Sequence, residues 1–199
     1  MCGFLFPLFL LKILIRTGGA KKDAKQIYSL NKQDMANWCS NTVEFIGEHS
    51  QFEYLEVLFT AMAAKEKKEC KGQLPAFVNE KDTGYLFETR WEGGILYYET
   101  KWSPNFGVMK HIAEHFRIGF IHRYAEPGNM VYGEASYKDG VFTDVFLQPV
   151  DYDLCGFDED TDTYTFEGNT YESNDEILEI LLERKKEAQA LQDLNNNEY

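Results

Sequence analysis

The sequence is poor in the residues that mark several classes of protein. Its 199 residues include four cysteines, at positions 2, 39, 70 and 155, and no two of them form a Cys-x-x-Cys pair. This spacing argues against a zinc ribbon or a redox dithiol, and four widely spaced cysteines do not indicate a disulfide-stabilised fold. We therefore expect reduced thiols in a cytoplasmic protein, with Cys39 buried.

Basic residues are also few. The chain has 20 Lys and Arg against 33 Asp and Glu, for a formal net charge of -13. Asp151 to Glu183 contains twelve carboxylates and no Lys or Arg. A field of this sign repels phosphate, because affinity for nucleic acid depends on cations that displace counterions. We expect no direct nucleic-acid binding, and a protein partner of this surface should be basic.

The chain lacks an apolar run of the about 20 residues that span a bilayer. The longest begins at Gly3 and reaches Ile15, but Lys12 interrupts it, and further positive charges follow it instead of preceding it as in a secretory signal. We interpret residues 1–34 as a leader outside the fold, produced by an upstream start, with Met35 as the true start. A membrane-surface anchor and an export signal are the alternatives, and only these imply contact with a membrane.

What the chain does have is alternation. Apolar and polar residues alternate from Thr42 to Glu48, which predicts a strand with one buried face. The segments that follow predict two helices, one over Ser50–Lys68 and one that begins at Pro104 with Ser103 as its N-cap. They also predict five strands, at Tyr85–Trp91, Ile95–Trp102, Gly119–Tyr124, Met130–Tyr137 and Val141–Leu147. This order predicts an α+β, ferredoxin-like fold in residues 35–150: an antiparallel sheet with both helices on one face, extended by an extra β-hairpin.

Residues 151–199 predict an appendage to this domain. After the acidic connector, short strands at 164–166 and 169–171 form a hairpin. Ser173 and Glu176 match a capping box at the start of a C-terminal helix that reaches about Leu191. The predicted apolar stripe of this helix is Ile177, Ile180, Leu181 and Leu191.

Several short signatures resemble one family. They are Met35–Asn41, Tyr98–Pro104, Tyr132–Glu134 and Asp139–Gly140. Together they resemble the YubB-like ferredoxin-like-domain family over residues 35–147, although Asn105 and Phe106 stand where that family tends to have a second proline or aromatic. The resemblance implies a protein of bacterial plasmids, phages and other mobile elements, and it supplies no catalytic residue.

The sharpest chemical motif is His111-Ile112-Ala113-Glu114-His115. It matches the His-x-x-Glu-His pattern of inverted zinc peptidases, in which both imidazoles grip one Zn²⁺ and the glutamate is the general base. Such enzymes place a third ligand on a following helix, whereas the next predicted element here is a strand. A zinc-dependent hydrolase using His111, Glu114 and His115 is therefore an alternative, and we expect no cofactor.

Two further surfaces are candidates for binding. Asp158, Glu159, Asp160 and Asp162 resemble the opening of a calcium loop, but Thr163 stands where its glycine belongs, so a solvated acidic connector is favoured. The longer acidic run Asp151–Glu183 is either a mimic of DNA or a solvated face, and composition does not choose between them. Tyr98 and Trp102 lie on aromatic-rich strands, where exposed rings mark a protein-binding surface.

We therefore expect a non-enzymatic, acidic protein-interaction domain with a role in counter-defence. Single-stranded nucleic-acid binding by the aromatic sheet is a further alternative. The sequence leaves the oligomeric state open.

Overall fold

The computed structural model describes residues 37–79 and 84–196, so the predicted leader lies outside the described residues. The first elements are β1 (Trp38–Ile46), α2 (His49–Glu69), β2 (Phe87–Glu92), β3 (Ile95–Lys101), α3 (Phe106–Phe116) and β4 (Gly119–Glu126). The later elements are η3 (Pro127–Asn129), β5 (Val131–Lys138), β6 (Val141–Phe146), α4 (Pro149–Tyr152), β7 (Gly156–Asp158), β8 (Thr163–Phe166), β9 (Asn169–Tyr171) and α5 (Asn174–Asn196).

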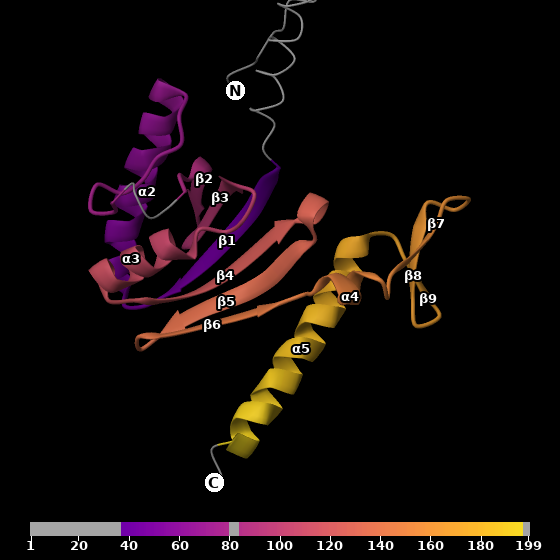
Figure 1. The fold of residues 1–199 in the computed structure, drawn as a ribbon. Helices are drawn as coiled ribbons and strands as arrows, with labels where there is room; N and C mark the ends of the chain where they lie inside the picture. The colour runs from indigo at the N-terminus through magenta and orange to yellow at the C-terminus, as the bar shows by residue number, and fades with distance from the viewer. Residues whose placement is uncertain (1–36, 80–83, 197–199) are drawn as a thin grey trace, which may run out of the picture. The chain divides into compact units, whose positions relative to one another are not determined.

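Six strands form one antiparallel sheet in the order β2-β3-β1-β4-β5-β6 (Figure 1). The first four strands, joined through α2 and α3, have the order and connections of a ferredoxin-like fold. The hairpin of β5 and β6 then extends the sheet beyond β4. The predicted fold class is confirmed.

The central strand β1 has the burial that its sequence predicts. Val43 and Phe45 are buried, and Glu44 between them is exposed. Cys39, also predicted to be buried, is fully enclosed on the same face, and this burial raises the pKa of its thiol to about 11. Since the thiolate is the reactive form, the Cys39 side chain is an inert packing group.

Helices α2 and α3 cover one face of the sheet. Leu55 and Phe59 from α2 and Val108 and Ile112 from α3 share one core cluster with Val43 of β1. Each of these side chains is fully buried, and each contributes about 1.5 to 3 kcal/mol through removal of apolar surface from water. Both helices therefore lie on one face of the sheet, as the sequence predicts.

The start of α3 differs from the prediction. Asn105, not Ser103, is the N-cap residue, and the helix begins at Phe106. Ser103 is instead part of a tight turn, where its amide donates to the Lys101 carbonyl and its carbonyl accepts from the Thr100 hydroxyl. These bonds stop the chain from becoming helical at Pro104.

The free edge of β2 is protected. Glu88 has a left-handed backbone, with φ of 50°, at an irregularity in the pairing of β2 with β3. The amides of Glu88 and Thr89 donate to the two carboxylate oxygens of Glu66 on α2, at 2.7 and 3.0 Å. Gln73 also forms a bridge with Leu86 just before the strand. These contacts satisfy backbone groups that an added strand would otherwise use.

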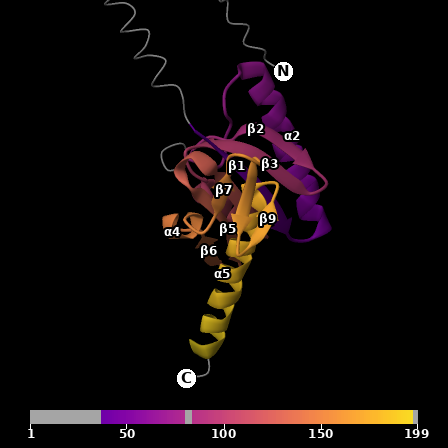
Figure 2. The ribbon, with the colours of Figure 1, turned by 90° about the vertical axis from the view of Figure 1, so that its right-hand side faces the viewer.

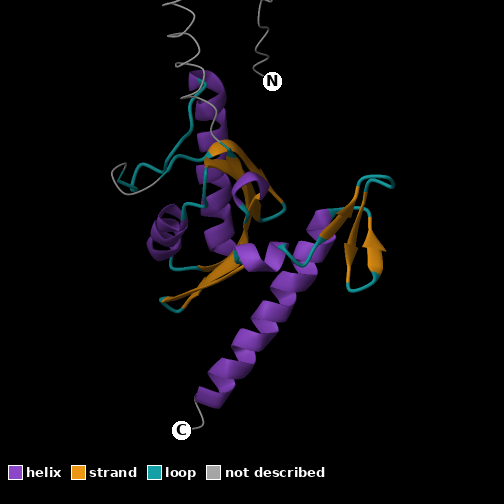
Figure 3. Cartoon of the chain, turned by 45° about the vertical axis from the view of Figure 1, so that its right-hand side comes forward, coloured by secondary structure: helices purple, strands orange, loops and turns teal. Residues whose placement is uncertain are grey.

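The C-terminal elements pack on the other face of the sheet. The small sheet β7-β8-β9 lies beside the start of α5 (Figure 3). Ile177 and Leu181 of α5 share a second core cluster with Leu147 and with Phe166 of this sheet. Strand β7 is an addition to the predicted hairpin. The helix runs to Asn196, and Leu191 is 62% exposed, so its place in the predicted buried stripe is wrong.

None of the helices in the described ranges has the length and apolar character needed to cross a bilayer.

Candidate functional site

The three residues of the predicted zinc motif lie on α3. His111, Glu114 and His115 are all exposed, and the His115 ring stacks on Phe77 at 3.9 Å between ring centroids. Within residues 37–79 and 84–196, no three His, Cys, Asp or Glu side chains are placed to hold a metal ion. His115 is therefore engaged in an aromatic contact, and among the described residues none is placed as a third ligand to the motif.

The predicted acidic residues lie in the turn that joins β7 and β8. Asp158, Glu159, Asp160 and Asp162 are exposed. The Asp158 carboxylate accepts hydrogen bonds from the amides of Asp160, at 2.9 Å, and Thr161, at 3.4 Å. This is a local turn in which the side chain satisfies its own backbone. The carboxylates are solvated, and one of them holds the turn in shape.

Tyr98 does not belong to any surface. Its side chain is 2% exposed on β3, on the face that α2 and α3 cover, so its predicted place in a protein-binding surface is wrong. The side chains of its neighbours Tyr97 and Glu99 lie on the opposite face of β3, away from this core. The sequence could not decide which of two adjacent tyrosines is inside, because both fit a period-two pattern.

Tyr98 belongs to a buried hydrogen-bond network. Its hydroxyl donates to Asn105 Oδ1 at 2.8 Å and lies 3.3 Å from His122 Nε2. The same nitrogen of His122 lies 2.9 Å from Asn41 Oδ1, and Asn41 Nδ2 donates to the Thr100 hydroxyl oxygen. Burial lowers the pKa of His122 to about 3 and raises that of Tyr98 well above its usual range. Both groups are therefore neutral.

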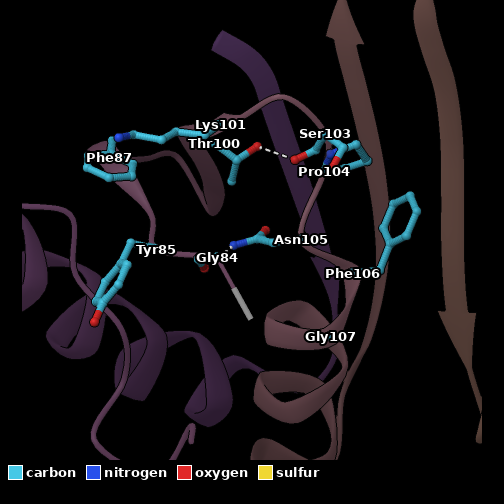
Figure 4. Close-up of a pocket in the computed structure, with 10 residues that line it drawn as sticks. All are labelled: Gly84, Tyr85, Phe87, Thr100, Lys101, Ser103, Pro104, Asn105, Phe106 and Gly107. Carbon is cyan, nitrogen blue, oxygen red and sulfur yellow. Dashed lines mark hydrogen bonds between the residues drawn. The ribbon is translucent and has the colours of Figure 1, made fainter. Parts of the chain in front are cut away.

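The outer end of this network is the wall of a cavity. Asn105 Nδ2 donates to the Gly84 carbonyl, and Thr100 Oγ1 to the Ser103 carbonyl, at 2.9 Å each (Figure 4). The cavity has a volume of about 550 Å³. It is lined by Gly84, Tyr85, Phe87, Thr100, Lys101, Ser103, Pro104, Asn105, Phe106 and Gly107. Its polar side chains mostly hold the walls together, and its aromatic rings supply the surface.

Trp102 lies in the turn beside this cavity in a strained conformation. Its φ is 72°, and the Ser103 amide donates to the Lys101 carbonyl at 2.9 Å across it. A residue with positive φ whose two neighbours are joined by such a hydrogen bond is the centre of a classic γ-turn, which is rare and strained. A bulky residue in this region costs about 1 to 2 kcal/mol. The Trp102 side chain is nevertheless 50% exposed, so core packing does not explain the strain.

A second cavity adjoins the first. It has a volume of about 630 Å³ and lies beside the C-terminal end of α2. Tyr85 and Phe87 line both cavities and therefore separate them. The Trp38 ring contacts the Phe87 ring edge-on, with 5.0 Å between the ring centroids. The Lys101 ammonium nitrogen lies within 6 Å of both ring centroids. We call Trp38, Tyr85, Phe87, Lys101 and Trp102 the aromatic corner.

The polar groups at and beneath the aromatic corner are committed to contacts within the chain. The Lys101 ammonium is held over aromatic rings, the Thr100 hydroxyl is committed to a carbonyl, and His122 is enclosed beneath. None of these groups is arranged as a nucleophile with an adjacent base. Trp102 was predicted from the sequence as a site residue, whereas Tyr85, Phe87 and Asn105 were not. A pattern in the sequence that could have indicated them is the high number of aromatic residues on both sides of the Trp102-Ser103-Pro104 turn.

Comparison with known proteins supports the fold. A family model described as the ferredoxin-like domain in Api92-like protein matches residues 79–167, the stretch from just before β2 to β8. The chain is similar to that family over this stretch, and the finer assignment to the YubB-like family stays a prediction. No curated protein and no solved structure matches the chain.

Proposed function

We propose that the chain is a non-enzymatic protein-binding domain and that the aromatic corner receives a side chain of a polypeptide partner. The observation that supports this proposal is Trp102, which is half exposed although its γ-turn backbone is strained. Strained backbone conformations cluster at functional sites, where the surrounding structure holds them in place. Here the strained backbone holds a large, half-exposed residue in the turn between Lys101 and Ser103, which both line the cavity.

The composition of the corner fits a binding site for protein. Tryptophan and tyrosine are the residues most enriched among those that dominate the energy of protein interfaces. The cavity of about 550 Å³ is of the size that accepts a side chain or a small ligand. The adjoining cavity across Tyr85 and Phe87 gives room for a second side chain of an extended segment.

The charge of the chain limits the partner. With a net charge of -13 and an exposed acidic turn at residues 158–162, long-range attraction favours a partner with Lys and Arg around the inserted side chain. An extension, drawn only from the resemblance to plasmid- and phage-borne proteins, is that the partner is a basic host protein whose DNA-binding surface the acidic exterior occupies. Cytoplasmic location is part of the same proposal.

The experiment is a selection of random peptides on the full chain. Peptides that bind should carry an aromatic or aliphatic residue flanked by Lys or Arg, and their affinity should fall as salt screens the charges. Trp102→Ala should weaken them at least tenfold, about 1.4 kcal/mol. Tyr54→Ala is the matched control, because Tyr54 is a 65% exposed aromatic on α2 that lines neither cavity.

Two results would contradict the proposal. One is a selection that yields no peptide, or peptides that bind the Trp102→Ala variant as well as the natural chain. The other is tighter binding of a single-stranded oligonucleotide at physiological salt than of any peptide, measured by fluorescence anisotropy. The second result would favour the alternative in which bases stack on Trp38, Phe87 and Trp102 beside Lys101.

A further inference from the structure

The last strand of the large sheet, β6, is an edge without the protection seen at β2. In the described part of the chain, β6 pairs only with β5. Its six residues, Val141 to Phe146, include no Pro, Lys or Arg, and its register with β5 is unbroken. Such an edge presents a row of unpaired amides and carbonyls, and natural proteins usually block one with the devices that β6 lacks.

Apolar side chains accompany this edge. Val141 is 63% exposed and Phe146 is 49% exposed. The only charged residue of the strand is Asp144, whose carboxylate accepts a hydrogen bond from the Tyr124 hydroxyl at 2.7 Å. Although the whole chain carries a net charge of -13, the strand itself adds only the half-buried Asp144 carboxylate.

Helix α5 extends past this edge. Its first half packs on the sheet through Ile177, Leu178, Leu181 and Leu182, but every residue from Glu187 to Asn196 is exposed. The views in Figures 1 and 2 agree that this second half runs away beyond β6. It is about 15 Å long at 1.5 Å per residue, enough to cover two or three strands spaced about 4.8 Å apart. We call Glu187–Asn196 the overhang.

The overhang leaves a gap beside the strand. A cavity of about 240 Å³ lies between β6 and α5, lined on the strand by Asp144, Val145 and Phe146 and on the helix by Lys185, Ala188, Gln189 and Gln192. Leu191 and Leu194 of the overhang are 62% and 65% exposed. A ten-residue helix without packing is marginal in water, so a structure that covers the overhang would stabilise it.

We propose that β6 pairs with β6 of a second copy of this chain about a two-fold axis, which joins the two sheets and places each overhang over the partner copy's strand. Two-fold antiparallel pairing uses the same edge on both copies, as the commonest symmetric dimers do. A single added peptide would cover one edge but leave the overhang without a second helix to complete the layer. The second copy supplies both a strand and a helix.

The register follows from which side chains share a face. Val145 lies opposite Glu134, and the Glu134 carboxylate forms an ion pair with Lys186 of α5. The side chains of Val141, Thr143 and Val145 therefore lie on the face of the sheet that α5 covers. Pairing centred on Thr143 sets Thr143 opposite itself and Val141 opposite Val145, both favourable cross-strand pairs. Pairing centred on Asp144 would oppose two carboxylates. The Thr143 register is therefore the one expected.

The size of this contact indicates a modest affinity. A strand edge about 20 Å long and an overhang about 15 Å long give several hundred Å² per copy, below the about 800 Å² of a standard interface. Repulsion between two chains of charge -13 also opposes association, and salt reduces it. We therefore expect a reversible dimer that strengthens as salt is raised.

Analytical ultracentrifugation of the full chain tests the proposal. The natural chain should show a monomer–dimer equilibrium at ~100 μM and ~0.15 M salt, where the Debye length is about 8 Å. Thr143→Lys should raise the dissociation constant at least tenfold, because two ammonium groups then lie opposite each other. Thr143 is exposed, so circular dichroism should show the variant folded.

A mixture provides the sharper readout. Equal amounts of the Thr143→Lys and Thr143→Glu variants should form dimers again, because only a two-fold contact at this residue sets Lys opposite Glu. Val57→Lys, at a 70% exposed position on α2, is the matched control and should dimerise as the natural chain does. Three results would each overturn the proposal. The natural chain could stay a monomer at every protein and salt concentration, Thr143→Lys could form dimers as stable as those of the natural chain, or the mixture of the two variants could form no dimers.

Discussion

At the scale of single residues, the buried His122 makes stability depend on pH. Burial holds its pKa at about 3 against about 6.5 in the unfolded chain, so below pH 6.5 the unfolded state takes up a proton that the native state does not. The contribution of His122 is complete above pH 6.5 and is lost as pH falls towards 3. The slope is up to about 1.4 kcal/mol per pH unit, and the total over this range is about 5 kcal/mol.

Urea unfolding of the natural chain and of His122→Gln, measured from pH 4.5 to 7, checks this prediction. The amide of glutamine can replace Nε2 as a donor to Asn41 but does not titrate in this range. The variant should be less stable at pH 7 and should lose less stability on acidification. Parallel pH profiles of the two proteins would show that other groups control the acid response.

Trp102 offers a second test at this scale, because its strain and its side chain can be separated. Trp102→Gly removes both the ring and the strain, since glycine adopts positive φ freely, whereas Trp102→Ala removes the ring and keeps a Cβ in the γ-turn. The glycine variant should therefore be more stable than the alanine variant by about 1 kcal/mol. Thermal unfolding measures the difference, and equal stabilities would mean that the turn is unstrained.

These residues also show what the sequence can and cannot predict. The pattern of β1 identified Val43 and Phe45 as buried because a strand alternates strictly. The predicted strands on either side of Gly93 and Gly94 also formed, and both glycines have the positive φ of a tight turn. Tyr98, the exposed Leu191 and the γ-turn at Trp102 were not predictable, because each depends on which tertiary neighbour lies opposite. The aromatic corner joins Trp38, Phe87 and Lys101 from three strands, and no local pattern links them.

At the scale of elements, the contact between α2 and β2 depends on Glu66. One carboxylate accepts both amides of the irregular β2 backbone, and hydrogen bonds to a charged acceptor are stronger than neutral ones. Glu66→Ala should cost about 2 kcal/mol, because two backbone donors lose their partner. Hydrogen exchange should show faster exchange at the amides of Glu88 and Thr89 in particular.

The control on the same helix is Glu56→Ala, which removes an exposed carboxylate that faces no strand. Its effect should stay within about 0.5 kcal/mol. If the two variants are equally stable, the bulge of β2 is held by its own backbone. The Glu66 variant is also expected to aggregate more readily, because it unblocks the second edge of the large sheet.

At the scale of the whole molecule, the question is whether the C-terminal elements unfold with the sheet. The sequence predicted a boundary at residue 150, and two core clusters, one under α2 and α3 and one under α5, share no residue. However, the second cluster includes Leu147 and packs against Tyr132 of β5 and Val145 of β6, so it is built partly on the large sheet. Release of α5 would expose these residues and weaken β5 and β6.

We therefore expect one cooperative transition. Leu182→Ala removes a side chain that is 2% exposed and should lower the free energy of unfolding by about 2 to 5 kcal/mol, whereas Leu194→Ala, at a 65% exposed position, should change it by less than about 0.5 kcal/mol. Native-state hydrogen exchange measures which amides follow. If Leu182→Ala speeds exchange at Val43 in β1 as much as at Ile180 in α5, the two clusters are coupled through β4, β5 and β6. Faster exchange confined to α5 and β7-β8-β9 would instead mean that this region opens alone, which would also remove the support that the overhang needs for dimer formation.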